Sequence, residues 1–299
     1  MRNRGSRLVI GPWPHGGRWY SSPLVRGRRA TDFDHVAELV RFFDRHLRDA
    51  DHAFSTEDPV HYFTMGEERW KSARAWPPPE ARPLVFYPGP GGELRPTQPD
   101  RNEADRYIVD FKAGTGVHSR FGKHLAGGRY PVGYPDRARR DRQLLVYTSA
   151  PLAEDTEVTG HPRACLQVSS TATDGAIIVY LEEVAPDGTV RVITDGALRL
   201  VTRQASPGGW PYWAADLYRP FRRADVVPVT PGEVVDLTFD LFPVSWLFRA
   251  GHALRLALAG ADADNFLAIA EDQAPTVCVH HGPGFPSRLE LPAMPRRDG

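Results

Sequence analysis

The spacing of apolar residues along the chain changes from a helical period to an alternating one near residue 59. Before that point, residues 7–11 form a short apolar run of the kind found in buried parallel strands. Residues from about 32 to 48 then predict an amphipathic helix, which Thr31 or Asp32 can cap. Its apolar side chains recur at steps of three and four residues and form one stripe, made of Phe33, Val36, Leu39, Val40, Phe43 and Leu47. A strand, a loop and a helix in this order are typical of the closing unit of a doubly wound sheet.

From Pro59 onward apolar and polar residues alternate, as in strands that bury one face. The segment from Val234 to Phe242 is the clearest case, and Pro186-Asp187-Gly188 predicts a hairpin turn between two other strands. The 28 prolines and 27 glycines suit many short strands rather than long helices. This part of the chain is therefore predicted to form a two-layer β-sandwich or jelly roll.

Composition narrows the classes of function. The 299 residues include 37 Lys and Arg and 37 Asp and Glu, so a formal net charge of zero gives no reason to expect nucleic acid or an anionic membrane as partner. No apolar run is long enough to span a bilayer, and residues 1–6 lack the apolar part of a secretory signal, which predicts a cytoplasmic protein. Cys165 and Cys278 are expected to be buried free thiols rather than a disulfide framework.

The loop after the first apolar run carries the main candidate for chemistry. It reads Gly11-Pro-Trp-Pro-His-Gly-Gly, so that His15 closely follows a strand. In an α/β-hydrolase the catalytic histidine lies in such a loop, after the serine and the acid in chain order. No G-x-S-x-G segment occurs in the sequence, and Ser119 lies in a stretch of the wrong spacing. His15 is therefore either a triad base whose partners are not in this chain or an ordinary turn residue. Trp13 either lines an acyl pocket or packs at a domain seam.

Two clusters invite a metal-binding interpretation that their spacing does not support. The segment Asp262-Ala-Asp264-Asn265 lacks the glycine and the terminal ligand of an EF-hand loop, so a strand-end turn is expected. His280 and His281 are neighbours on a strand, point to opposite faces and cannot readily share an ion. We therefore expect no metal ion and no other cofactor.

Three further groups have both a structural and a functional interpretation. Glu182 and Glu183 fall on opposite faces of a strand, so they are not expected to act as an acid–base pair. The basic run from Arg137 to Arg142 is short and interrupted by an aspartate, which favours a solvated surface over a nucleic-acid site. The aromatic loop Trp210-Pro-Tyr-Trp213 either caps a site or is buried against a neighbouring domain.

These motifs, in their order along the chain, resemble the cocaine esterase and Xaa-Pro dipeptidyl-peptidase group of serine hydrolases. The resemblance spans about residues 7–295. It rests on the Gly11–Gly16 loop, Phe42–Leu47, Tyr62–Trp70, Thr148–Gly160, Thr194–Arg199 and Phe239–His252.

The resemblance implies a mainly β chain in two parts. Residues 1–57 correspond to the C-terminal remnant of an α/β-hydrolase catalytic domain, and residues 58–299 to a jelly-roll β-domain. It also implies cleavage of acyl esters, amides or Xaa-Pro dipeptides by a Ser–Asp–His triad without a cofactor, of which only His15 can be carried over. The partners it implies are a small ester, amide or peptide substrate and an upstream catalytic half. A homo-oligomer is left open, and a non-catalytic β-sandwich binding module is the alternative.

Overall fold

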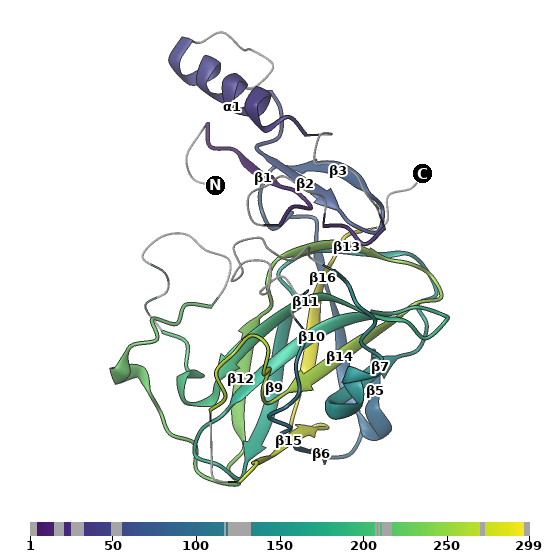
Figure 1. Cartoon of the computed structure of the whole chain (residues 1–299), viewed down its shortest axis with the longest axis vertical. Helices are drawn as coiled ribbons and strands as arrows, with labels where there is room; N and C mark the ends of the chain where they lie inside the picture. Colours follow the sequence, from purple (N-terminus) through teal and green to yellow (C-terminus); the bar gives the residue numbers. More distant parts are fainter. Residues whose placement is uncertain are drawn as a thin grey trace.

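The computed structural model of the protein consists of a small sheet with one helix, set on a larger β-sandwich (Figure 1). It describes residues 5–14, 21–24, 33–48, 56–116, 118, 133–206, 208, 210, 217–269 and 273–295. The mainly β class predicted from the sequence is confirmed. No helix in the described part of the chain is long and apolar enough to cross a bilayer.

The small sheet contains the first strand of the chain. Its order is β1-β2-β3, formed by β1 (Leu8–Ile10), β2 (Val60–Thr64) and β3 (Arg69–Ala73). β1 runs parallel to β2, with Leu8 opposite Val60, and β2 pairs with β3 in antiparallel fashion. The expected boundary between residues 57 and 58 thus falls between two strands that pair with each other. A small core lies on this sheet and comprises Val60, Tyr62, Ala73 and Trp76 with the partly buried Leu8 and Ile10.

The predicted helix forms as α1 (His35–Phe43), which continues into the π-helical turn η2 (Asp44–Arg48). Its cap is Asp34, whose carboxylate accepts hydrogen bonds from the backbone N–H groups of Val36 and Ala37, each at 3.0 Å. The prediction that Thr31 or Asp32 caps the helix was wrong, because Asp34 reaches the first free N–H groups itself. Thr31 and Asp32 lie outside the described residues.

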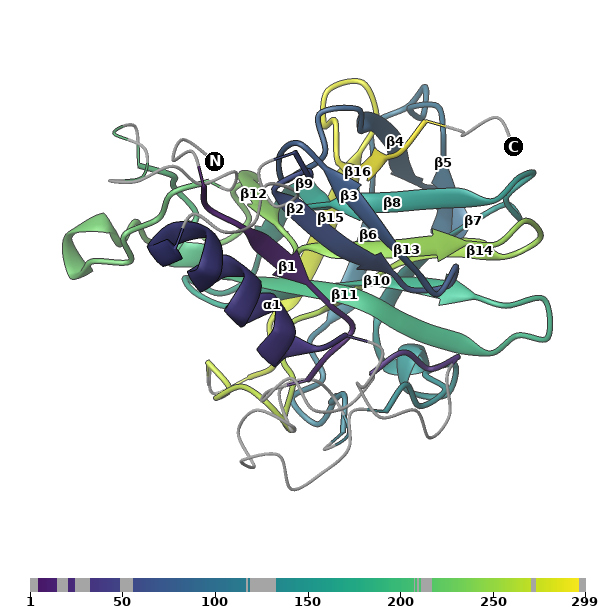
Figure 2. The ribbon, with the colours of Figure 1, turned by 90° about the horizontal axis from the view of Figure 1, so that it is seen from above.

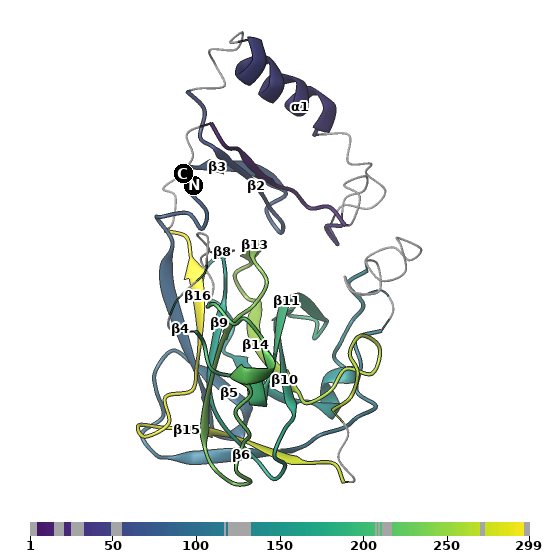
Figure 3. The ribbon, with the colours of Figure 1, turned by 90° about the vertical axis from the view of Figure 1, so that its left-hand side faces the viewer.

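The apolar stripe of α1 faces away from the rest of the described chain. Its exposed fractions are 68% for Val36, 57% for Leu39, 51% for Val40, 52% for Phe43 and 78% for Leu47. Figures 1 and 3 show α1 beyond the small sheet, on the side away from the sandwich, and in Figure 2, seen from above, α1 lies in front of that sheet. The opposite face of the helix contacts the chain through ion pairs, Arg7 Nε to Glu38 at 2.6 Å and Arg41 to Glu57 at 2.7 Å.

The sandwich has two layers of strands. The first layer follows the order β11 (Val190–Arg199), β10 (Ala176–Val184), β14 (Ala253–Ala259), β7 (Leu145–Ser149) and β5 (Glu93–Arg95). The second contains β12 (Val235–Asp240), β9 (Arg163–Ser170), β15 (Thr276–His281), β6 (Glu103–Ile108), β16 (Arg288–Ala293), β8 (Thr156–Gly160) and β13 (Val244–Phe248). β4 (Arg82–Gly89) joins the layers, because residues 82–86 pair with β16 and residues 87–89 pair with β5.

The apolar faces of both layers meet in one core, as the alternating pattern predicts. In β12 the residues Val235, Leu237 and Phe239 are buried while Asp236 is exposed. The hairpin predicted at Pro186–Gly188 connects β10 to β11, which pair in antiparallel register. The largest fully buried side chains include Trp246, Tyr147, Phe248, Leu166, Leu181 and Leu237.

Hydrogen bonds fix the small sheet to the sandwich. The backbone of Met65, just after β2, accepts from Leu247 N at 2.8 Å and donates to Ser245 O at 3.0 Å. Buried hydroxyl groups continue the seam, since Ser245 Oγ lies 2.9 Å from Thr64 Oγ1 and 2.8 Å from Thr159 Oγ1. The loop that follows β1 is therefore carried on a platform bound directly to the sandwich.

Candidate functional site

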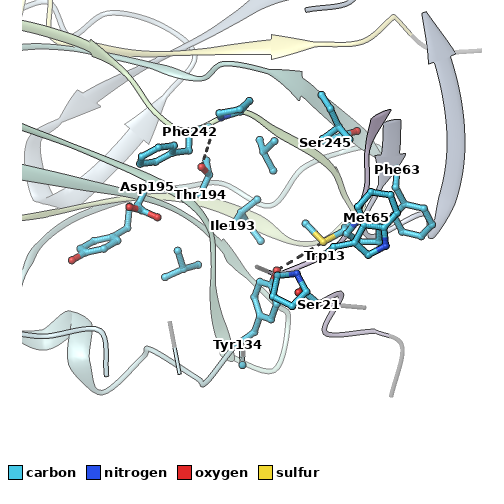
Figure 4. Close-up of a pocket in the computed structure, with 18 of the residues that line it drawn as sticks. Trp13, Ser21, Phe63, Met65, Tyr134, Ile193, Thr194, Asp195, Phe242 and Ser245 are labelled. Carbon is cyan, nitrogen blue, oxygen red and sulfur yellow. Dashed lines mark hydrogen bonds between the residues drawn. The ribbon is translucent and has the colours of Figure 1, made fainter. Parts of the chain in front are cut away.

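A cavity of about 290 Å³ lies where the small sheet meets the sandwich (Figure 4). One wall comes from the loop after β1, the second from β2 and the residues beyond it, and the third from strands of the sandwich. The lining is mostly apolar and aromatic, and its polar side chains are distributed around the cavity. Such an arrangement suits a small organic molecule with an apolar body. Principal lining residues are Trp13, Phe63, Met65, Tyr134, Ile193, Phe242 and Val244.

Trp13 both lines this cavity and packs in an aromatic cluster. Its ring centroid lies 4.4 Å from that of His35, 5.2 Å from that of Phe33 and 5.7 Å from that of Trp70. These partners come from the start of α1 and from β3, so the cluster joins the loop to both elements. The two interpretations of Trp13 are therefore compatible in this geometry.

His15, the predicted base, lies outside the described residues, which stop at Pro14 and resume at Ser21. The two ends of this loop are held together, because Ser21 N donates to Pro12 O at 2.7 Å. Pro14, the residue before His15, is among those that line the cavity.

Several lining residues were not singled out by the sequence. Tyr134 is one of them, and its hydroxyl lies 3.8 Å from the sulfur of Met65. Burial raises the pKa of Tyr134 to about 12, so the phenol stays neutral at ordinary pH. Phe63 belongs to β2, whereas Phe242 follows β12, so the lining is brought together by the fold alone. No local motif marks these residues.

Polar side chains of the lining include Arg137, Tyr180 and Asp195. The Arg137 guanidinium stacks 4.6 Å from the centre of the Tyr180 ring. Its Nε lies 3.1 Å from Glu182 and 3.3 Å from Asp141. The predicted solvated basic run is therefore wrong for Arg137 and Asp141, which are both 3% exposed because they pair with each other and with β10.

Glu182 and Glu183 lie on opposite faces of β10, as predicted. Glu182 meets Arg137, whereas Glu183 contacts Arg191 at 3.1 Å and His252 at 3.1 Å. Complete burial raises the pKa of Glu182 well above its ordinary value, and the neighbouring charge of Asp141 raises it further. The neutral form of Glu182 is therefore favoured more than that of an exposed glutamate, and Glu182 and Glu183 contact different partners on the two faces of the strand.

The clusters with metal-like composition have structural contacts. Asp262 is buried and accepts hydrogen bonds from Thr115 Oγ1 at 2.6 Å and from Tyr180 at 3.0 Å. Its Oδ1 also accepts from the backbone N–H of Asp264 at 3.2 Å, as expected for a strand-end turn. Within the described ranges, no group of three or more His, Cys, Asp or Glu side chains could hold a metal ion.

The two histidines on β15 point to different surroundings. His280 Nε2 lies 2.9 Å from Ser169 Oγ, and His281 Nε2 lies 3.1 Å from Asp105 Oδ2. Cys165 and Cys278 are free, and burial raises the pKa of the Cys165 thiol to about 11. The two histidines therefore do not form a shared site, and neither do the two cysteines.

The aromatic loop is described only in part. Trp210 stacks on Tyr218 with ring centroids 4.6 Å apart, and it is not among the described residues that line the cavity. Residues 211–213 lie outside the described residues.

The fold defines the class of the protein as a two-layer β-sandwich domain that carries a small sheet and one helix at one end. Residues 52–290 match the family described as the X-Pro dipeptidyl-peptidase C-terminal non-catalytic domain, and the chain belongs to this family. The resemblance to the cocaine esterase and Xaa-Pro dipeptidyl-peptidase group is thereby confirmed.

Two sequence relatives cover nearly all of the chain. The Mycobacterium bovis protein named "Putative serine esterase Mb1866c" is 49% identical over 97% of this chain and 46% of its own length. Cocaine esterase of a Rhodococcus species is 29% identical over 98% of this chain and 52% of its own length. The chain therefore spans about half of the length of these relatives.

A solved structure shares the fold. The crystal structure of an aminopeptidase from a marine sediment Thaumarchaeota archaeon superposes with a TM-score of 0.78 and 20% identity. The match covers 98% of this chain and 51% of that protein. At this identity the likeness concerns the fold and not the substrate.

Proposed function

We propose that this chain supplies the general base and part of the substrate pocket of a serine hydrolase that cleaves esters, amides or Xaa-Pro peptides. The observation that supports this proposal most directly is the cavity between the loop after β1 and the sandwich. Residues 11–14 line one side of it, and His15 is the next residue in the sequence. A catalytic base at this place adjoins a pocket of suitable size for an acyl group.

In the proposed reaction His15 takes the proton from a serine hydroxyl and returns it to the leaving group. The serine, and in this proposal also the carboxylate that orients the histidine, lie outside these 299 residues, which contain no G-x-S-x-G motif. Residues 1–57 then complete the hydrolase domain of that enzyme, and residues 58–299 form its β-domain. Trp13 forms part of the wall against which the acyl group packs.

Two surfaces of the small sheet and its helix suit such a companion. The edge of β1 opposite β2 pairs with no strand in the described part of the chain, so its backbone groups can extend a parallel sheet. The apolar stripe of α1 is exposed from Val36 to Leu47, and α1 lies over the small sheet on the side away from the sandwich. A hydrolase half would cover both surfaces at once.

The names of the relatives support this chemistry. A serine esterase and a cocaine esterase both match the chain along nearly its full length. Each of these proteins is about twice as long as the matched region, which leaves room for the remaining catalytic residues.

The proposal is tested by combining the chain with a polypeptide that carries the upstream half of the family, including its serine motif. The chain alone should hydrolyse an activated ester no faster than a surface imidazole does, because it has no nucleophile to activate. The complex should be active, and His15→Ala should lower kcat by on the order of 10⁶-fold. His118→Ala serves as the control and should change kcat little. Full activity of His15→Ala in the complex contradicts the proposal.

One observation favours a non-catalytic role as second candidate. The matching family is described as non-catalytic and covers residues 52–290, which excludes His15. If the chain is a binding or interaction module, adding the upstream half should restore no esterase activity. The same experiment, in which the upstream half is added and esterase activity is measured, therefore separates the two candidate functions.

A further inference from the structure

We propose that Glu68 is a positioning residue for His15, because it anchors to the sandwich the chain directly after the loop that carries His15. We call residues 12–21 the His15 loop. This inference rests on the proposed function, since it takes His15 as the base. The contacts that support it lie entirely among described residues, at the C-terminal end of the loop and in the turn between β2 and β3.

The chain is anchored directly after the His15 loop by one hydroxyl group. Ser22 is 6% exposed, and its Oγ donates a hydrogen bond to Glu68 Oε1 at 2.7 Å. Ser22 Oγ also accepts a hydrogen bond from the backbone N–H of Leu24 at 3.3 Å. Since Ser21 is also bonded to Pro12, the two ends of the loop and the carboxylate of Glu68 form one connected unit.

Glu68 itself is held in an unusual conformation. Its φ of 61° lies in the left-handed region that residues other than glycine seldom occupy. Its backbone N–H donates to Thr64 O at 2.8 Å, and its Oε1 accepts from the N–H of Gly66 at 3.0 Å. Its other carboxylate oxygen is buried without a hydrogen-bond partner in the described part of the chain. These features cost folding free energy, so a role in stability alone does not explain a glutamate here.

The turn that carries Glu68 is bound to the sandwich. Arg249 Nη2 donates to Gly66 O at 2.7 Å, and Leu247 N donates to Met65 O at 2.8 Å. A Cβ on Gly66 would lie 2.5 Å from Leu247 O, so the turn and β13 are in close contact. An unbroken series of contacts thus runs from β13 through Glu68 to Ser22 and the His15 loop.

The neighbouring Glu67 provides a matched comparison. It lies in the same turn and pairs with Lys71 and, at 3.4 Å, with Arg69. Both partners belong to β3. Glu67→Ala therefore removes a carboxylate from the turn without removing the bond to Ser22.

The test compares Glu68→Ala, Ser22→Ala and Glu67→Ala in two measurements. Hydrogen exchange of the chain alone should quicken over residues 12–24 in the first two variants and stay unchanged in Glu67→Ala. In the complex with the upstream half, Glu68→Ala and Ser22→Ala should each lower kcat by up to about 10²-fold with little change in KM, because the base is misplaced. The double variant should be no slower than either single one, because the two changes break the same bond. Glu68→Gln keeps the accepting oxygen and should retain most of kcat.

Several results would overturn this proposal. Equal exchange over residues 12–24 in Glu68→Ala and Glu67→Ala would show that the bond to Ser22 does not hold the segment. An unchanged kcat in Glu68→Ala, or a loss in Glu68→Gln as large as in Glu68→Ala, would show that the anchor does not act on the base. Full activity of His15→Ala in the complex would instead contradict the proposed function. The hydrogen-exchange measurement would still test whether the contact between Glu68 and Ser22 holds the segment.

Discussion

At the scale of single residues, two adjacent glutamates on β10 show how the fold assigns different chemistry to one residue type. Glu182 is fully buried beside Asp141 and Arg137, whereas Glu183 is paired with Arg191 and His252. The alternation of strand side chains predicted that they would face opposite ways. It did not predict their surroundings, because Asp141 and Arg137 come from a loop whose course no local pattern specifies.

The raised pKa of Glu182 makes the stability of the fold depend on pH. A carboxyl group whose pKa is raised by folding contributes stability that is fully present below its unfolded pKa and is lost as pH rises through the folded pKa. Glu182→Gln removes this titration and keeps a neutral side chain that can donate to Asp141. We expect the unfolding free energy of the wild type, relative to the variant, to fall as pH rises above the ordinary range of a glutamate. Urea unfolding of both proteins at a series of pH values measures this free-energy difference. A difference that stays constant with pH would contradict the prediction.

At the scale of elements, α1 differs most from what its sequence alone would lead one to expect. The periodicity of its apolar residues predicts a buried stripe, and the helix does form, but its polar side meets the chain through Arg7 and Glu57. Periodicity shows that a face is apolar and does not show what covers it. The same reason explains β1, whose strand character was predictable while its pairing with β2 was not, because Leu8 pairs with Val60, 52 positions further along the chain.

We expect Leu39→Glu to separate folding from assembly. Leu39 is 57% exposed, so the change should alter the unfolding free energy of the chain by no more than about 0.5 kcal/mol. Binding of the upstream half should weaken, since burial of a leucine contributes about 1.5–3 kcal/mol and a buried unpaired charge adds a further cost. Calorimetric titration with the upstream half measures the affinity. Arg48→Gln, an exposed change off the stripe, is the control, and equal affinities for the two variants would show that the stripe is not the contact surface.

At the scale of the whole molecule, the cavity shows the limit of reading function from the sequence. The motif around His15 and the family of the chain could be recognised from local residues. The cavity walls could not, because Tyr134, Phe242 and Met65 lie in separate segments and meet only when the small sheet docks on the sandwich. Sequence patterns report which face of an element is buried and leave the packing of one element on another undetermined.

The two parts of the molecule should differ in local stability. β1 and β12 each pair with a single strand in the described chain, but β12 buries three side chains in the large core, whereas the side chains of β1 are only partly buried. In the monomeric chain we expect backbone amides of residues 8–10 to exchange much faster than those of residues 235–240. Native-state hydrogen exchange followed by mass spectrometry measures both segments. Equal protection of the two would show that the small sheet and the sandwich unfold together.

β4 has a consequence for how the sandwich comes apart. Its first five residues are bonded to one layer and its last three to the other, so a single backbone ladder runs across the gap between them. The layers cannot peel apart by loss of side-chain contacts alone, since this strand must also break its own hydrogen bonds. We therefore expect partial forms with one intact layer to be disfavoured and the sandwich to unfold as one cooperative unit.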